Sequence, residues 1–156
     1  MKVYTFKTVQ RLPISLEQAW DFFSSPANLK EITPAKLNFK ILDDYQGEKM
    51  YAGQVISYFV SPIFGIPLRW TTEITHVKDR EYFIDEQRFG PYALWLHKHF
   101  FKEIPGGVEM TDFLHYAVPL GFIGRLANAI VVKGQIDTIF SYRYKLLEER
   151  FGKMPA

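Results

Sequence analysis

The chain has 156 residues, enough for one domain with a sizeable core, and 17% of them are aromatic. Its 19 Lys and Arg against 17 Asp and Glu give a net charge of +2, too small and too evenly spread to indicate nucleic-acid binding. The absence of cysteine excludes disulfide scaffolds, thiol nucleophiles and Cys-ligated metal sites, so a cytoplasmic protein is the simplest expectation.

The distribution of apolar residues indicates neither a leader nor a membrane span. Residues Met1–Gln10 alternate between polar and apolar types, unlike a signal peptide. The longest apolar stretch, Tyr116–Val132, is interrupted by Arg125 and Asn128 and falls short of the roughly 20 continuous residues that a bilayer requires. We therefore expect a soluble protein.

The first predicted elements are one strand and two short helices. Residues Val3–Leu12 alternate as in a strand. Ser15 and Gln18 then form a capping-box pattern that predicts a short helix through Phe23. The Pro26 that follows Ser25 is typical of a first helical position, so a second helix is expected to run to Thr33 and Pro34.

The middle of the chain has the punctuation of an antiparallel meander. Breakers such as Gly47, Pro62 to Pro67, Lys78 to Arg80 and Gly90-Pro91 separate the apolar runs. Short spacers between the later runs favour hairpins. The predicted strands are Leu37–Leu42, Gln54–Val60, Leu68–Val77, Glu81–Phe89, Ala93–Lys102 and Val108–Tyr116.

The C-terminal part predicts one long helix over residues Gly121–Phe151, because it lacks proline and spaces its apolar residues helically. An antiparallel sheet of seven strands twists and curls, which leaves a concave face. A helix of that length can lie across the opening. The sequence therefore predicts an α+β fold with a cavity between sheet and helix.

In this order of elements and in several motifs, the sequence resembles the START-like, or SRPBCC, ligand-binding superfamily. The resemblance is carried by Leu16–Phe23, by Pro26–Leu29, and by Asp85–Tyr92 leading to the Trp95, His97 and His99 positions. The segments Asp85 to His99 and Gly107 to Asp112 are similar to one subgroup whose members are largely uncharacterised.

The resemblance covers nearly the full chain and implies one START-like domain over residues 1–156. It implies the helix-grip fold, in which a seven-stranded antiparallel sheet wraps a long C-terminal helix. It also implies a binder of hydrophobic or amphipathic small molecules. The superfamily includes enzymes such as aromatase/cyclases, and fold alone does not separate the two activities.

Strand parity predicts which side chains face the cavity. Glu86 and Arg88 mark the solvent face of one strand, Lys98 and Lys102 that of the next, and Glu109 that of the last. The opposite positions are then expected to point inward, and they are Phe83, Asp85, Gln87 and Phe89, then Trp95, His97, His99 and Phe101, then Met110, Asp112, Leu114 and Tyr116.

This parity places five polar residues among aromatics, namely Asp85, Gln87, His97, His99 and Asp112. Buried polar groups cost free energy unless they are paired, so three interpretations are open. The set is a structural network that holds strands in register, or it binds the polar head of a ligand, or one His acts as a general acid or base. No residue is assigned a catalytic role.

Two histidines on one strand face, with a carboxylate, are also a possible metal-ligand set. The spacing of His97 and His99 is weak evidence on its own, and the resemblance adds nothing to it. No metal and no cofactor are therefore predicted.

Three further positions complete the expected cavity. Tyr58 and Trp70 lie on central strands, and Gly134 inside the long helix predicts a close approach there, with a kink as its alternative. The predicted lining is Tyr58, Trp70, Phe83, Asp85, Gln87, Phe89, Trp95, His97, His99, Phe101, Met110, Asp112 and Gly134. Trp20 and Phe23 are expected to be core residues.

The apolar loop Phe59–Pro67 is a candidate lid, dimer contact or transient membrane contact, or it folds back over the core. The leading prediction is a protein that binds or carries a lipid, isoprenoid or aromatic polyketide-like molecule. The alternatives are a cyclase, hydratase or isomerase that uses a pocket His, and a partner-binding module that uses residues 59–67. No nucleic-acid partner is expected, and the sequence leaves the oligomeric state open.

Overall fold

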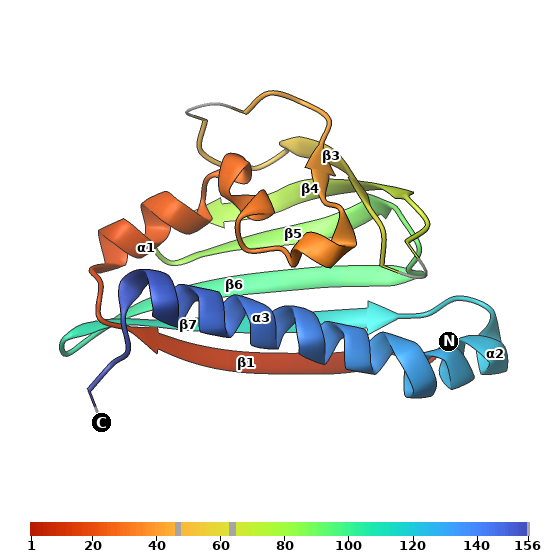
Figure 1. Ribbon diagram of the computed structural model, residues 1–156. Helices are drawn as coiled ribbons and strands as arrows, with labels where there is room; N and C mark the ends of the chain where they lie inside the picture. Colours follow the sequence, from red (N-terminus) through yellow and green to blue (C-terminus); the bar gives the residue numbers. More distant parts are fainter. Residues whose placement is uncertain (46–47, 63–64, 156) are drawn as a thin grey trace.

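A computed structural model describes residues 1–45, 48–62 and 65–155. The structure is an α+β fold in which a curved antiparallel sheet wraps a long C-terminal helix (Figure 1). In chain order the elements are β1 (Tyr4–Leu12), α1 (Leu16–Phe23), η1 (Pro26–Lys30), η2 (Ala35–Leu37), β2 (Lys40–Ile41), β3 (Val55–Val60), β4 (Leu68–Lys78), β5 (Tyr82–Phe89), β6 (Leu94–Ile104), β7 (Gly107–Ala117), α2 (Gly121–Ala127), η3 (Asn128–Val132) and α3 (Lys133–Phe151).

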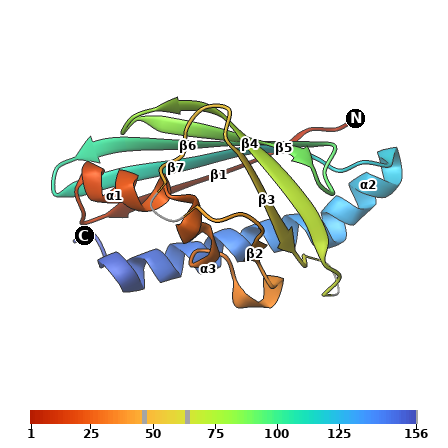
Figure 2. The ribbon, with the colours of Figure 1, turned by 90° about the horizontal axis from the view of Figure 1, so that it is seen from above.

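The seven strands form one sheet in the order β1-β7-β6-β5-β4-β3-β2, with antiparallel neighbours throughout. Strand β7 therefore pairs with the first strand of the chain, and the helices after β1 connect it to β2 at the far edge. Helix α3 runs along the concave side of the sheet (Figures 1 and 2). The predicted helix-grip fold is confirmed.

The first helix begins as the sequence predicts. The Ser15 hydroxyl accepts a hydrogen bond from the Gln18 backbone N–H, and the Gln18 side chain accepts one from the Ser15 N–H. The second predicted helix is a 3₁₀ helix, η1, with Pro26 at its first position.

The prediction of a full strand over Leu37–Leu42 is wrong. A 3₁₀ turn occupies Ala35–Leu37, and Asn38 follows in the left-handed conformation with φ of 47°. Asn tolerates this conformation, which redirects the chain so that only Lys40–Ile41 pair with β3. The predicted breaker Gly47 lies outside the described residues.

The long C-terminal helix is confirmed from Gly121 to Phe151, with one π-helical stretch between α2 and α3. The apolar face of α3 carries Ile136, Phe140 and Leu147, all buried against the sheet. The buried core follows this contact line. One cluster joins α1 to the α3 C-terminus, and another joins β1 and β7 to Phe140.

The prediction that Gly134 allows a close approach to the cavity is wrong. Gly134 is exposed, and a Cβ atom there would have no neighbour within 4 Å. A glycine of the C-terminal helical region that does permit close packing is Gly124, where a Cβ would lie 1.9 Å from the Pro119 carbonyl oxygen. This contact fixes the start of the C-terminal helix against the turn after β7.

Candidate functional site

A cavity of about 200 Å³ lies between the concave face of the sheet and α3. Its walls are mainly aromatic and aliphatic, and its polar lining is concentrated on β5, β6 and α3. The side chains that line it are Phe23, Leu29, Ile32, Thr33, Leu37, Phe39, Met50, Ile56, Tyr58, Val60, Pro62, Trp70, Thr72, Ile74, Phe83, Asp85, Tyr92, Trp95, His97, His99, Gln135, Ile136, Ile139, Phe140 and Arg143.

The register of three neighbouring strands brings the polar residues together. Asp85 on β5 stands opposite His97 on β6, and His99 on β6 stands opposite Asp112 on β7. Residues two apart on a strand share a face, so His97 and His99 lie side by side between the two carboxylates. Their ring centroids are 3.8 Å apart.

Both histidines contact both aspartates. His97 Nε2 lies 3.0 Å from Asp112 Oδ1, and His99 Nε2 lies 2.8 Å from Asp85 Oδ2. His99 Nδ1 is 2.9 Å from Asp112 Oδ1 but lacks the alignment of a hydrogen bond. His97 Nδ1 is 3.8 Å from Asp85 Oδ2. The four side chains form one compact, buried group.

Arg143 on α3 completes this group, and sequence reasoning missed it. Its Nη1 is 3.5 Å from Asp112 Oδ1, and its Cζ lies 5.2 Å from the centre of the Phe23 ring. Within the described residues its buried Nε makes no hydrogen bond. Helical spacing contains the signal, because Arg143 continues the buried series of Ile136 and Phe140.

The two histidines differ in pKa although they are neighbours. Burial, the largest effect, and the charge of His99 lower the pKa of His97. Together they outweigh the hydrogen bond to Asp112, which would raise it. Burial alone would lower the pKa of His99 too, but its contacts with Asp112 and Asp85 outweigh burial and raise it. Near neutral pH, His99 is thus the more readily protonated of the two.

Asp112 remains ionised within this group. Burial by itself would raise the pKa of Asp112, but the Arg143 charge and the contacts with His97 and His99 lower it well below its usual value. An ionised carboxylate only accepts hydrogen bonds, so His97 donates its Nε2–H to Asp112. Neutral His97 then directs the Nδ1 lone pair toward Asp85.

Of the predicted lining, seven residues border the cavity, and Asp112 lies directly behind them. The seven are Tyr58, Trp70, Phe83, Asp85, Trp95, His97 and His99. Asp112 contacts both histidines but does not itself form the wall. Parity thus predicted the centre of the site correctly.

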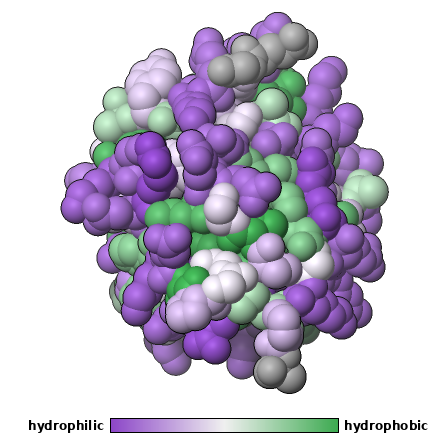
Figure 3. Space-filling model, turned by 90° about the vertical axis from the view of Figure 1, so that its left-hand side faces the viewer, coloured by the Kyte–Doolittle hydropathy of each residue, from purple (hydrophilic) through white to green (hydrophobic). Residues whose placement is uncertain are grey.

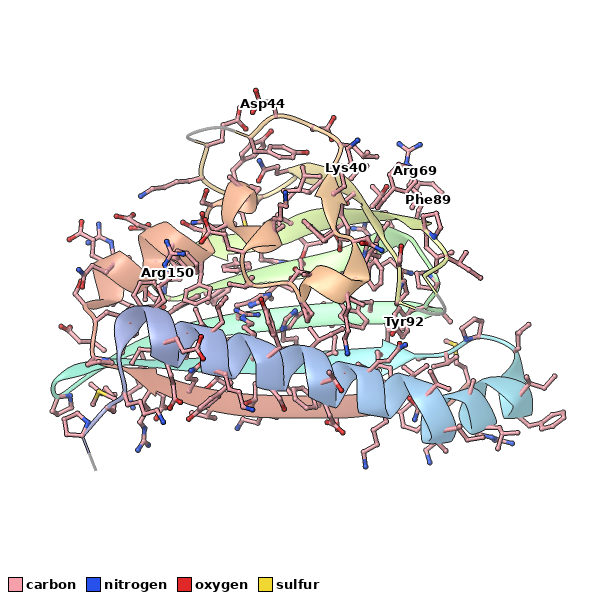
Figure 4. The ribbon with its side chains drawn as sticks, in the orientation of Figure 1. Lys40, Asp44, Arg69, Phe89, Tyr92 and Arg150 are labelled. Atoms are coloured by element: carbon pink, nitrogen blue, oxygen red, sulfur yellow. The ribbon has the colours of Figure 1, made fainter. Side chains whose placement is uncertain are left out.

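The prediction that Phe89 faces the cavity is wrong, because Phe89 is 72% exposed. The pairing of β4 with β5 shifts between Thr71 and Thr72, so that Phe89 stands opposite Thr71 on the outer face. A bulge of this kind reverses strand parity. Figure 4 shows Phe89 beside Arg69, pointing away from the space between sheet and α3, whereas Tyr92 points into it.

Gln87 faces inward but does not line the cavity. Its side-chain amide donates to the Tyr92 carbonyl at 2.7 Å, and its side-chain oxygen accepts from the Tyr92 N–H at 3.2 Å. Both polar atoms are thus used to close the connection between β5 and β6. Gln87 positions Tyr92, which does line the cavity.

Phe101 and Met110 also point inward without lining the cavity. Both are buried in the core cluster that contains Trp20 on α1. The Trp20 and Phe101 rings meet edge to face at a centroid distance of 5.4 Å. Helix α1 therefore covers this end of the concave face. Trp20 is a core residue as predicted, whereas Phe23 belongs to both the core and the cavity wall.

Of the predicted apolar loop, Ile63 and Phe64 lie outside the described residues. Val60 and Ser61 at its start are buried, and Ile66 is exposed. Pro62 lines the cavity, and its carbonyl oxygen accepts a hydrogen bond from the Gln135 side chain on α3. The start of this loop is therefore tied to the helix at the cavity edge.

A set of possible metal ligands is present within the group. Asp85, His97 and His99 each offer one ligand atom, and these atoms all lie within 4.8 Å of one another.

Among the described residues, no helix is both long and apolar enough to cross a bilayer.

Solved structures similar to this chain share its fold at low sequence identity. Protein CV1439 from Chromobacterium violaceum has a TM-score of 0.72 at 13% identity, covering 96% of this chain and 98% of its own. Protein Ms6760 from Mycobacterium smegmatis has a TM-score of 0.66 at 17% identity, with the same coverage. Ara h 8.0201 has a TM-score of 0.58 at 16% identity, covering 95% and 99%.

No family model matches the sequence, and no curated protein matches it either. The structural similarities extend over nearly the whole length of both chains in each pair. They show that the chain has the helix-grip fold of these proteins.

We expect the Asp112→Asn variant to lose about 3 kcal/mol or more of unfolding free energy, because it leaves buried Arg143 and His99 without their shared carboxylate. Urea denaturation followed by circular dichroism measures the loss. The matched control is Glu109→Gln on the same strand, whose partner Arg11 is exposed, with an expected loss below about 1 kcal/mol. Equal, small losses in both variants would contradict this assignment.

Proposed function

We propose that the protein binds a small hydrophobic molecule with one polar end in the cavity between sheet and α3. The observation that carries the proposal is the asymmetry of the cavity wall. Aromatic and aliphatic side chains form most of it, and Asp85, His97, His99 and Arg143 form one polar patch. Ligand sites commonly combine an apolar wall with a few convergent polar groups.

The aromatic wall supports a flat or chain-like apolar body in the ligand. Tyr58 stacks on Trp70 at a centroid distance of 6.0 Å, and Trp95 meets Trp70 edge to face at 5.1 Å. Such rings present large apolar surfaces at little cost in side-chain entropy. A lipid, isoprenoid or aromatic polyketide-like molecule has the matching chemistry.

The cavity volume limits the size of what is enclosed. About 200 Å³ is below the range of roughly 300 to 1,000 Å³ for pockets that enclose a drug-sized ligand. The enclosed part is therefore a small ring system, or one end of a longer chain whose remainder leaves through the opening. In either arrangement we propose that the polar end of the ligand contacts Asp85 and His97.

The fold and the sequence motifs support the same conclusion. The START-like resemblance of residues Leu16–Phe23 and Asp85–Tyr92 implies ligand binding in a helix-grip cavity. The similar solved structures share that fold. We therefore propose that residues 1–156 form one START-like ligand-binding domain, acting as a carrier or a binding protein.

Filling the cavity tests this function. Ile139 lines the cavity from α3, so Ile139→Trp should occupy the space of the ligand body. We expect the affinity for N-phenyl-1-naphthylamine, an uncharged apolar dye that fluoresces when buried, to fall by about tenfold or more, since even a few lost apolar contacts correspond to 1.4 kcal/mol. Fluorescence titration measures the change.

Tyr142→Trp is the matched control, because Tyr142 lies on the same helix and is exposed. It should leave dye affinity unchanged. Dye binding that is absent from the unmodified protein, or that both variants retain in full, would refute cavity binding. If the cavity binds a ligand as proposed, native mass spectrometry of protein purified from its own host should show a bound small molecule. The Ile139→Trp variant should lack it.

A further inference from the structure

We propose that Asp85, His97 and His99 bind a divalent first-row transition metal ion, such as Zn²⁺ or Fe²⁺, at the polar wall of the cavity. Two imidazole nitrogens and one carboxylate oxygen are a ligand set that such ions prefer. The sequence alone offered two histidines with a carboxylate that it did not single out, on spacing that was weak evidence. The structure adds the third ligand and the groups that hold the histidines in place.

The three donor atoms converge at suitable distances. Asp85, His97 and His99 each offer one ligand atom, and these atoms all lie within 4.8 Å of one another. Ligand bonds of about 2.1 Å separate neighbouring donors by about 3.0 to 3.4 Å in octahedral or tetrahedral geometry. The observed separations from Asp85 Oδ2, 2.8 Å to His99 and 3.8 Å to His97, bracket this range.

Asp112 contacts the opposite nitrogen of each ring. His97 Nε2 is 3.0 Å and His99 Nδ1 is 2.9 Å from the same Asp112 oxygen. Metal-binding histidines typically place their second ring nitrogen against a carboxylate, which fixes the ring and its tautomer. Here one carboxylate contacts both rings, with an aligned hydrogen bond to His97 only, and Arg143 contacts that carboxylate from α3.

A purely structural network leaves one contact unexplained. His97 uses its Nε2–H on Asp112, so its Nδ1 presents a lone pair to a second acceptor, Asp85 Oδ2, at 3.8 Å. Asp85 Oδ2 already accepts a hydrogen bond from His99 Nε2, so its contact with His97 brings two lone-pair atoms together with no proton between them. A cation bound by Asp85, His97 and His99 would be shared by both atoms.

The remaining coordination positions open toward the ligand cavity. All three ligand residues line the cavity wall. Three protein ligands leave at least one position free, as in metal sites that bind exogenous molecules. An oxygen atom at the polar end of the bound molecule is suited to fill it, which links the metal to the proposed function.

The test is isothermal titration of the chelator-treated full chain with Zn²⁺. We expect one ion per chain, with affinity reduced about 100-fold or more in His97→Ala and about 10- to 100-fold in Asp112→Asn. Co²⁺ in place of Zn²⁺ should give visible absorption bands of a site with nitrogen and oxygen ligands. Asp85→Asn, which removes a ligand charge and keeps the side-chain shape, should also weaken binding and serves if His97→Ala does not fold.

His76→Ala and His115→Ala are the controls, since neither residue lines the cavity or belongs to the ligand group. Absence of stoichiometric Zn²⁺ binding would overturn the proposal, as would binding that Asp85→Asn and Asp112→Asn leave unchanged. If Zn²⁺ does not bind but the dye still does, the metal proposal is wrong and the proposed ligand-binding function is unaffected.

A separate observation concerns the surface of α2 and η3. Six large apolar side chains in this short stretch are exposed, and Leu120 and Phe122 at its start are 74% and 70% exposed. Large apolar side chains exposed together on one short stretch are typical of an interaction site. The six, which we call the α2 patch, are Leu120, Phe122, Ile123, Leu126, Ile130 and Val131.

The charges around the α2 patch indicate the partner. Arg125 and Lys133 lie within or beside it, and residues 113–136 contain no Asp or Glu. The N-terminus lies at the same end of the molecule as α2 in both ribbon views (Figures 1 and 2). The opposite end is mainly hydrophilic around a narrow apolar strip (Figure 3). We infer that the α2 patch docks on an anionic lipid surface.

A second copy of the chain fits this surface less well. Symmetric pairing would bring Arg125 and Lys133 of both copies together, without acidic residues in the same stretch to neutralise them. A lipid surface accepts the apolar side chains and supplies negative charge for the cations.

Vesicle flotation tests the inference. We expect binding to vesicles of phosphatidylcholine mixed with phosphatidylglycerol, weaker binding to phosphatidylcholine alone, and at least about tenfold weaker partition for Phe122→Glu. Tyr51→Glu, an exposed position outside the patch, is the control and should bind normally. No binding to the anionic vesicles, or a dimer in solution that Phe122→Glu dissociates, would overturn the inference.

Discussion

The buried carboxylate of Asp112 is the interaction on which the candidate site depends. It lies behind the cavity wall and contacts His97, His99 and Arg143 from three different directions. An isolated buried charge would be costly, so these contacts are what permit an ionised carboxylate there. In return Asp112 fixes the tautomer of His97, raises the pKa of His99 together with Asp85, and connects the sheet to α3 through Arg143.

The fold makes this arrangement possible by placing three central strands under one helix. Strands β5, β6 and β7 contribute Asp85, the two histidines and Asp112 at adjacent register positions, and α3 contributes Arg143 from the other side. The curvature of the sheet then leaves space that large aromatic side chains only partly fill. Aromatic residues therefore have two roles. Those around Trp20 and Phe101 form part of the core, and those around Trp70 and Trp95 form the cavity wall.

The sequence was sufficient for the fold and for the centre of the site, for identifiable reasons. Charged residues such as Lys98 mark the outer face of each strand, and regular alternation then predicts His97 and His99 inside. Alternation fails where pairing is irregular, and the bulge opposite Thr71 and Thr72 turned Phe89 outward. Strand parity also predicts which face of the sheet a side chain lies on, but not which element packs against that face. Phe101 and Met110 point inward as predicted, yet α1 covers them. Arg143 required knowledge of which helix face meets the sheet.

Long-range ¹H–¹⁵N correlation spectra of the histidine side chains test the central role of Asp112 most directly. For the chelator-treated, metal-free chain, the account predicts that His97 is neutral near pH 7 with its proton on Nε2, and that it remains neutral at pH values where His99 is already charged. The Asp112→Asn variant, which removes a charge that raises the pKa of both rings, should lower the pKa of His99, whose remaining carboxylate contact is Asp85. A His97 ring protonated on Nδ1, or two histidines that titrate together like solvent-exposed imidazoles, would contradict the account.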